Sequence, residues 1–159
     1  MACEHIAFTG GRAQGLAVPD GTALVVSSPE MLNKLGTVSL SWQPAHGDLT
    51  VHAVDIVRDG KRISVLGDGS DFSVLRREAR LEQQMLDGTL TAVKTIEGLR
   101  LGDVLRTAYS VSTRDSVLGG KAQTAAVLLP QPTKILFGRA RLVWPARSKV
   151  AYKSLLPGI

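Results

Sequence analysis

The side chains in this sequence that could act as a nucleophile, a base or a metal ligand are one cysteine and three histidines, namely Cys3, His5, His46 and His52. A structural zinc site takes four ligands in spaced pairs, and Cys3 and His5 are too close together to begin one. A nucleophilic site with Cys3, His52 and Asp55 is possible by residue type, because a thiol needs a base and the base needs an orienting carboxylate. No pattern places Cys3 where it would ionise, so we expect no catalytic residue and interpret His52 as a partly buried strand histidine.

Two glycine-containing stretches resemble ligand-binding loops but lack the residues that such loops require. In LGDGSDF, at 66–72, a dinucleotide fingerprint would need glycine in place of Phe72, and the acids do not fit a calcium loop. In LGGKA, at 118–122, Asp115 occupies the place of the first glycine of a phosphate-binding loop, and Ala122 the place of its hydroxyl residue. Both stretches are typical of turns between strands. We therefore predict that the chain binds no cofactor and no metal.

The pair Gly102-Asp103, in the segment EGLRLGDVLRTAYSV at 97–111, could also mark the edge of a site. Alternate residues of the following stretch share one face of a strand, namely Leu105, Thr107, Tyr109 and Val111. That face suits a protein core, and the opposite face suits water. The pattern therefore predicts that Gly102-Asp103 is the turn that begins a central strand.

Such alternation recurs along the chain between glycine, proline and aspartate residues, and it predicts an all-β fold, an antiparallel β-sandwich with one or two short helices. Asp59-Gly60 suits a tight hairpin turn between strands at 49–57 and 61–66. Further strands are expected at 22–27, 37–42, 72–76, 89–95, 122–129 and 136–144. Capping residues predict one helix from Ser28 to Gly36, and helix-forming residues predict another at 78–88.

Charge is distributed unevenly along the chain, which has a net charge of +5. From residue 116 onward there is no aspartate or glutamate, so this segment carries +7 and the preceding 115 residues carry −2. The candidate partner-binding residues lie in this basic segment and are Arg139, Arg141, Arg147 and Lys149. They could contact an acidic protein surface, although Arg139 and Arg141 also suit an ordinary solvated strand face. Aromatic residues are only 4% of the chain, too few for base stacking, so we expect no nucleic-acid partner.

The length of 159 residues fits one domain with a single core. No stretch approaches the roughly 20 apolar residues of a membrane helix. The first residues also lack the basic and then apolar pattern of a secretory signal, so we expect a soluble chain without a transmembrane segment and leave its compartment open. Cys3 is the single cysteine, which excludes an internal disulfide.

Four short motifs in a fixed order carry a resemblance to a known family. They are Arg58-Asp59-Gly60-Lys61, Leu75-Arg76-Arg77-Glu78, Asp87-Gly88 and Leu101-Gly102-Asp103-Val104. Over about 22–146, their order and spacing resemble domain of unknown function 3857, which precedes the catalytic domain in bacterial transglutaminase-like proteins. The resemblance implies an antiparallel β-sandwich that accompanies a papain-like core, with the Cys-His-Asp triad in the following domain and no position here matching it. It assigns 22–159 to one β-sandwich domain and leaves 1–21 as an unassigned N-terminal segment.

The expected function is therefore that of a non-catalytic accessory domain that mediates domain–domain or protein–protein contact. Its partner would be a transglutaminase-like domain in cis or another protein. The alternative is a ligand-binding β-sandwich for envelope polysaccharide or peptide, which would need exposed aromatic side chains. The indole side chains are Trp42 and Trp144, and the alternation places Trp144 on the inner face of its strand.

Overall fold

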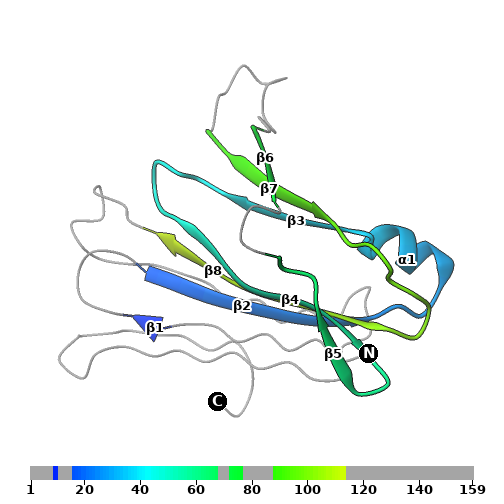
Figure 1. Cartoon of the computed structure of the whole chain (residues 1–159). Helices are drawn as coiled ribbons and strands as arrows, with labels where there is room; N and C mark the ends of the chain where they lie inside the picture. The colour runs from blue at the N-terminus through cyan, green and yellow to red at the C-terminus, as the bar shows by residue number, and fades with distance from the viewer. Residues whose placement is uncertain (1–8, 11–15, 68–71, 77–87, 114–159) are drawn as a thin grey trace, which may run out of the picture.

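The computed structural model describes residues 9–10, 16–67, 72–76 and 88–113, with side chains from residue 21 onward. Its elements in chain order are β1 (Thr9–Gly10), β2 (Leu16–Val25), α1 (Pro29–Leu35), β3 (Thr37–Trp42), β4 (Leu49–Arg58), β5 (Lys61–Ser64), β6 (Ser73–Arg76), β7 (Leu90–Thr95) and β8 (Val104–Thr113). They form a five-stranded sheet in the order β1-β2-β8-β4-β5 and a three-stranded sheet in the order β3-β7-β6 (Figure 1). All strand pairs are antiparallel, which confirms the predicted all-β, antiparallel sandwich.

Most predicted strands lie where alternation placed them, and the differences concern their ends. The strand expected at 22–27 begins earlier, at Leu16, because its ladder with β8 continues to Thr113. The second strand of the hairpin ends at Ser64 instead of residue 66. The helix expected at 78–88 and the strands expected at 122–129 and 136–144 lie outside the described residues, except for Gly88.

Helix α1 forms as its capping residues predict. The Ser28 side chain accepts a hydrogen bond from the Met31 backbone N–H at 3.2 Å, and Pro29 occupies the first turn. The Gly36 backbone N–H donates to the Leu32 carbonyl oxygen and ends the helix. Leu35 is buried, so α1 covers one end of the core. No helix among the described residues has the length and apolar character needed to cross a bilayer.

Strand β8 lies between β2 and β4, as predicted for the strand that follows Gly102-Asp103. Leu105 and Thr107 are buried, and Tyr109 packs against the core from the same face. Alternation along this strand therefore predicted the inward positions of Leu105, Thr107 and Tyr109 correctly, while Val111, the fourth predicted inner residue, is half-buried.

Strand β4 contains a β-bulge that the sequence pattern did not reveal. Val51 pairs with Tyr109 and Ala53 pairs with Ala108, so His52 is an extra residue between them. Strict alternation from Val51 would direct the even-numbered residues beyond the bulge away from the core. The extra residue reverses this alternation, and Val54 is fully buried as a result.

The core lies between the two sheets, where apolar side chains of both sheets and of their connections meet. Its buried members are Val26, Leu35, Val38, Leu40, Val54, Ile56, Ile96 and Leu105. The connection from β5 to β6 adds Val65, Leu66 and Phe72, which are partly buried against this cluster. One hydrophobic core therefore holds together both sheets and α1.

Candidate functional site

The predicted turn at Gly102-Asp103 holds the best-defined polar contact among the described residues. The Arg58 side chain donates from Nε to Asp103 Oδ1 at 2.8 Å and from Nη2 to Asp103 Oδ2 at 2.7 Å. The same Nη2 donates to the Gly98 carbonyl oxygen at 2.8 Å, and the Arg100 backbone N–H donates to Asp103 Oδ2 at 2.8 Å. Arg58 ends β4 and Asp103 precedes β8, so this two-pronged ion pair joins two segments that are 45 residues apart.

The electrostatics of this pair indicate a structural role. The hydrogen bonds from Arg58 hold the pKa of Asp103 below its usual range, and the hydrogen bond from the Arg100 N–H lowers this pKa as well. Burial of the carboxylate has the opposite effect and is outweighed. The hydrogen bonds to Asp103 raise the pKa of Arg58. A general acid or base needs a pKa near the working pH, whereas Asp103 stays ionised and is only 3% exposed. Asp103 therefore anchors a turn and is not suited to proton transfer.

The backbone around Asp103 explains why the turn contains glycine. Gly98 and Gly102 have φ values of 72° and 89°, a conformation that other residues adopt at a cost. The Val26 N–H donates to the Asp103 carbonyl oxygen at 2.8 Å, and the Gly102 N–H donates to the Val26 carbonyl oxygen at 2.9 Å. The turn is thus bonded to the segments that follow β2 and end β4, which places the 58–61 and 101–104 motifs together.

These joined motifs agree with the comparison with known families. Residues 22–158 match the profile of a Domain of Unknown Function with a solved structure, DUF3857. The chain belongs to the DUF3857 family. The match extends the resemblance, which covered about 22–146, to the basic C-terminal segment.

The DUF3857 fold also occurs within a longer protein of known structure. A crystal structure described as that of a "putative protease" from Parabacteroides distasonis superimposes with a TM-score of 0.59 at 16% sequence identity. The alignment covers 71% of this chain and 22% of that protein, so this chain matches less than a quarter of the other's length. At this identity the likeness shows a shared fold. No curated protein sequence matches the chain.

A second polar cluster lies on the opposite face of the five-stranded sheet from the core, and sequence analysis missed its pairing. Asp55 is buried, with a side chain 6% exposed, and its Oδ2 accepts a hydrogen bond from Arg106 Nη1 at 2.8 Å. Arg62 Nε lies 3.6 Å from the same oxygen. One carboxylate therefore faces two guanidinium groups, so the described residues of this cluster, Asp55, Arg62 and Arg106, sum to a charge of +1. An acid within the apolar stretch AVDIV was the available sequence signal, because a buried acid needs a partner.

The structure corrects the interpretation of His52. It is exposed instead of partly buried, and its Nε2 is 2.6 Å from Ser110 Oγ. Asp55 is engaged with Arg106 and does not orient His52 as a catalytic acid would. Cys3 lies outside the described residues. Within the described part of the chain, no group of histidine, cysteine or acidic side chains is arranged to hold a metal.

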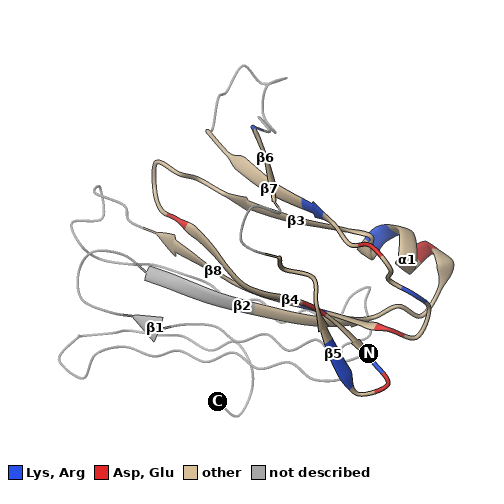
Figure 2. Ribbon diagram, in the orientation of Figure 1, with Lys and Arg blue, Asp and Glu red and all other residues tan. Residues whose placement is uncertain are grey.

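The four predicted partner-binding residues, Arg139, Arg141, Arg147 and Lys149, lie outside the described residues. Trp144 does as well, whereas Trp42 is half-buried. Phe72 and Tyr109 pack against the core, so the described aromatic side chains form no exposed platform for a sugar. The described part of this DUF3857 chain has its own basic strand, β5, whose first residues, Lys61 and Arg62, are blue in Figure 2.

Proposed function

We propose that this DUF3857 domain is a non-catalytic accessory domain of a transglutaminase-like or peptidase-like protein. The observation that carries the proposal is the similarity to a "putative protease" of which the chain covers only 22%. A fold that forms a small part of such a protein leaves most of its length for a separate catalytic domain. Under this proposal, residues 22–159 form one sandwich domain that contacts a catalytic domain in cis or another protein.

The use of ionisable side chains in the described sandwich supports a non-catalytic role. Asp103 and Asp55 are buried, and each is engaged with arginine. His52 is hydrogen-bonded to a serine on an exposed sheet face, without a carboxylate to orient it. These contacts hold strands together, whereas a catalytic site presents such groups toward a substrate.

We assign the contact in part to the basic C-terminal segment, through Arg139, Arg141, Arg147 and Lys149. Its charge of +7, without an acid from residue 116 onward, suits an acidic partner surface. The double substitution Arg139→Glu and Arg141→Glu should weaken association with the catalytic domain while the thermal stability of the sandwich is unchanged. Added salt should weaken the same association, because it screens exposed charges.

The non-catalytic assignment is tested with the purified 159-residue chain and peptide substrates for hydrolysis and amine cross-linking. The expected result is no turnover by the wild-type chain or by the variant Cys3→Ala. Turnover by the wild-type chain that Cys3→Ala abolishes would show that the domain is itself an enzyme.

A further inference from the structure

Strand β5 is an edge of the five-stranded sheet whose outer side pairs with no described strand. Its inner side pairs with β4, in register Arg58 with Lys61 and Val57 with Arg62. Every residue of β5 is exposed. An exposed strand edge is a template onto which another extended chain can add by backbone hydrogen bonding.

The hydrogen-bonding pattern defines which backbone groups of β5 point outward. In an antiparallel ladder, hydrogen-bonded pairs alternate with pairs whose N–H and C=O groups point away from each other. The Val65 N–H donates to the Val54 carbonyl oxygen at 2.8 Å, so the next pair, Asp55 with Ser64, is of the second kind. Arg62 lies two positions before Ser64, so its pair with Val57 is also of the second kind. The N–H and C=O groups of Arg62 and Ser64 therefore face the free edge.

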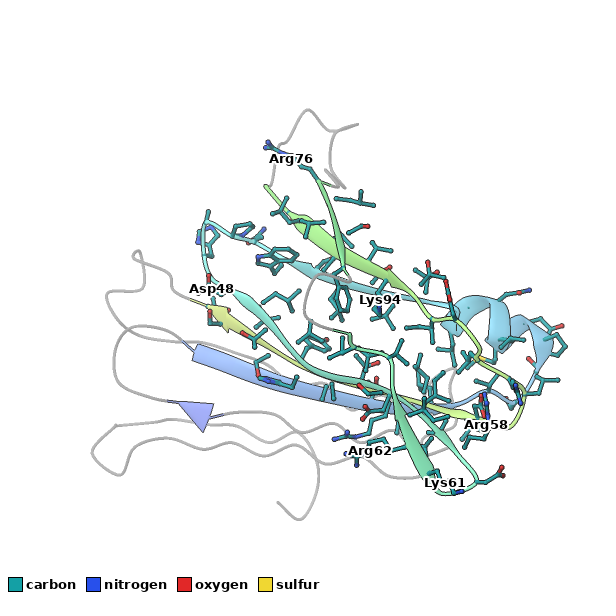
Figure 3. The ribbon with its side chains drawn as sticks, viewed as in Figure 1. Asp48, Arg58, Lys61, Arg62, Arg76 and Lys94 are labelled. Atoms are coloured by element: carbon teal, nitrogen blue, oxygen red, sulfur yellow. The ribbon has the colours of Figure 1, made fainter. Side chains whose placement is uncertain are left out.

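The side chains beside these backbone groups define the chemistry of a partner. Arg62 is 65% exposed and carries the surplus positive charge of the Asp55 cluster, and Lys61 adds a second exposed cation (Figure 3). Strand β5 contains no acidic residue. Ile63 points to the other face of the strand and is 44% exposed although it is apolar. A matching strand would present acids beside Arg62 and apolar side chains beside Ile63.

The charges on β5 argue against a second copy of this chain as the occupant. Two β5 edges paired antiparallel would bring Lys61 and Arg62 of both copies into one short ladder. Like charges in such positions repel. An acidic partner segment has no such conflict.

We propose that the free edge of β5 binds an extended segment of a partner protein in which acidic and apolar residues alternate. The segment adds as a strand, bonding to the N–H and C=O groups of Arg62 and Ser64, with its acids beside the Arg62 guanidinium group. This inference rests on the proposed function, since it names the chemistry of a contact that an accessory domain would make.

The test uses the full 159-residue chain and a peptide of about six residues, the length of an ordinary strand, with alternating glutamate and valine. Amide hydrogen exchange is followed by NMR with and without peptide. The expected result is that the amides of Arg62 and Ser64 become protected, because they alone among β5 amides point outward. Peptide affinity should fall as salt is raised, and a lysine–valine peptide of the same pattern should not bind.

Three variants separate backbone pairing from charge. Ser64→Pro removes an outward N–H, a change that edge strands tolerate, and Arg62→Glu reverses the charge while Arg106 still neutralises Asp55. Each should weaken peptide binding about tenfold or more. Lys34→Glu, with the same change in charge on the exposed surface of α1, should leave binding unchanged.

Two results would overturn the inference: no protection of the Arg62 and Ser64 amides by the glutamate–valine peptide, or equal binding by wild type and Arg62→Glu. The catalytic domain that the proposed function assigns as partner gives an independent control. If that domain binds the chain but the peptide does not, the β5 inference is wrong and the accessory role stands. If the peptide binds but the catalytic domain does not, the accessory role is wrong.

Discussion

Replacement of Asp103 by alanine should destabilise the domain strongly, because it removes the carboxylate that joins β4 to the 97–103 turn. Asp103 is 3% exposed and accepts two hydrogen bonds from Arg58 and one from the Arg100 backbone. Removal of one partner of a buried ion pair costs about 3–5 kcal/mol. The Arg58 guanidinium is 26% exposed and can regain water, so we expect a smaller loss of about 2–3 kcal/mol for Asp103→Ala.

The assay for this prediction is chemical and thermal unfolding followed by circular dichroism. A loss of about 2–3 kcal/mol lowers the melting temperature by about 4–12 °C in a domain of this size. The matched control is Glu97→Ala, which removes an exposed acid from the same turn and should change stability by less than about 0.5 kcal/mol. A double variant that also carries Arg58→Ala should lose less than the sum of the single losses, because the two residues share one interaction. The reasoning is refuted if Asp103→Ala is as stable as Glu97→Ala, or if the two single losses simply add.

Three further predictions concern the same sandwich. Since the pKa of Asp103 is lowered in the folded state, its contribution is complete above its unfolded value of about 4 and is lost as pH falls further. Unfolding measured against pH should therefore show wild type and Asp103→Ala converging in acid, and a stability difference that persists there would contradict this. Deletion of His52 should leave the domain folded, because Val51 then directly precedes Ala53 and regular alternation keeps Val54 and Ile56 facing the core, and His52→Ala should unfold within about 0.5 kcal/mol of wild type. Failure of the His52 deletion variant to fold, followed by circular dichroism, would exclude this register argument. Gly47→Ala should lower the melting temperature, because a Cβ at this buried position would collide with the Ser112 carbonyl oxygen, and an unchanged melting temperature would show that the 43–48 turn adapts.

Local patterns predicted those parts of the fold that neighbouring residues determine. The hairpin turn follows from Asp59-Gly60, and both residues have positive φ, at 50° and 75°, as the tight turn requires. Helix α1 follows from its serine cap, and β8 follows from its alternation. In each case the deciding residues lie within a few positions of one another.

Features that depend on distant residues could not be predicted from the sequence. The stretch LTVHAVDIV has apolar residues in both phases of alternation, Val51 in one and Val54 in the other, so only the pairing of β4 with β8 selects the bulge at His52. The Arg58–Asp103 pair joins two motifs that were recognised separately as family signatures, and nothing local indicates that they touch. The Asp55 cluster similarly depends on β5 and β8 lying on either side of β4. The positive charge of the C-terminal segment can be counted directly in the sequence. The position of the basic strand β5 at a sheet edge depends on the strand order, which the sequence does not give.

The proposed accessory role is tested most directly by the association of the 159-residue chain with the transglutaminase-like catalytic domain that the proposal assigns as its partner, measured by calorimetry at low and high salt. We predict binding that weakens as the Debye length falls from about 30 Å to about 3 Å between 0.01 M and 1 M salt. No association at either salt concentration, with both proteins folded, would contradict the account.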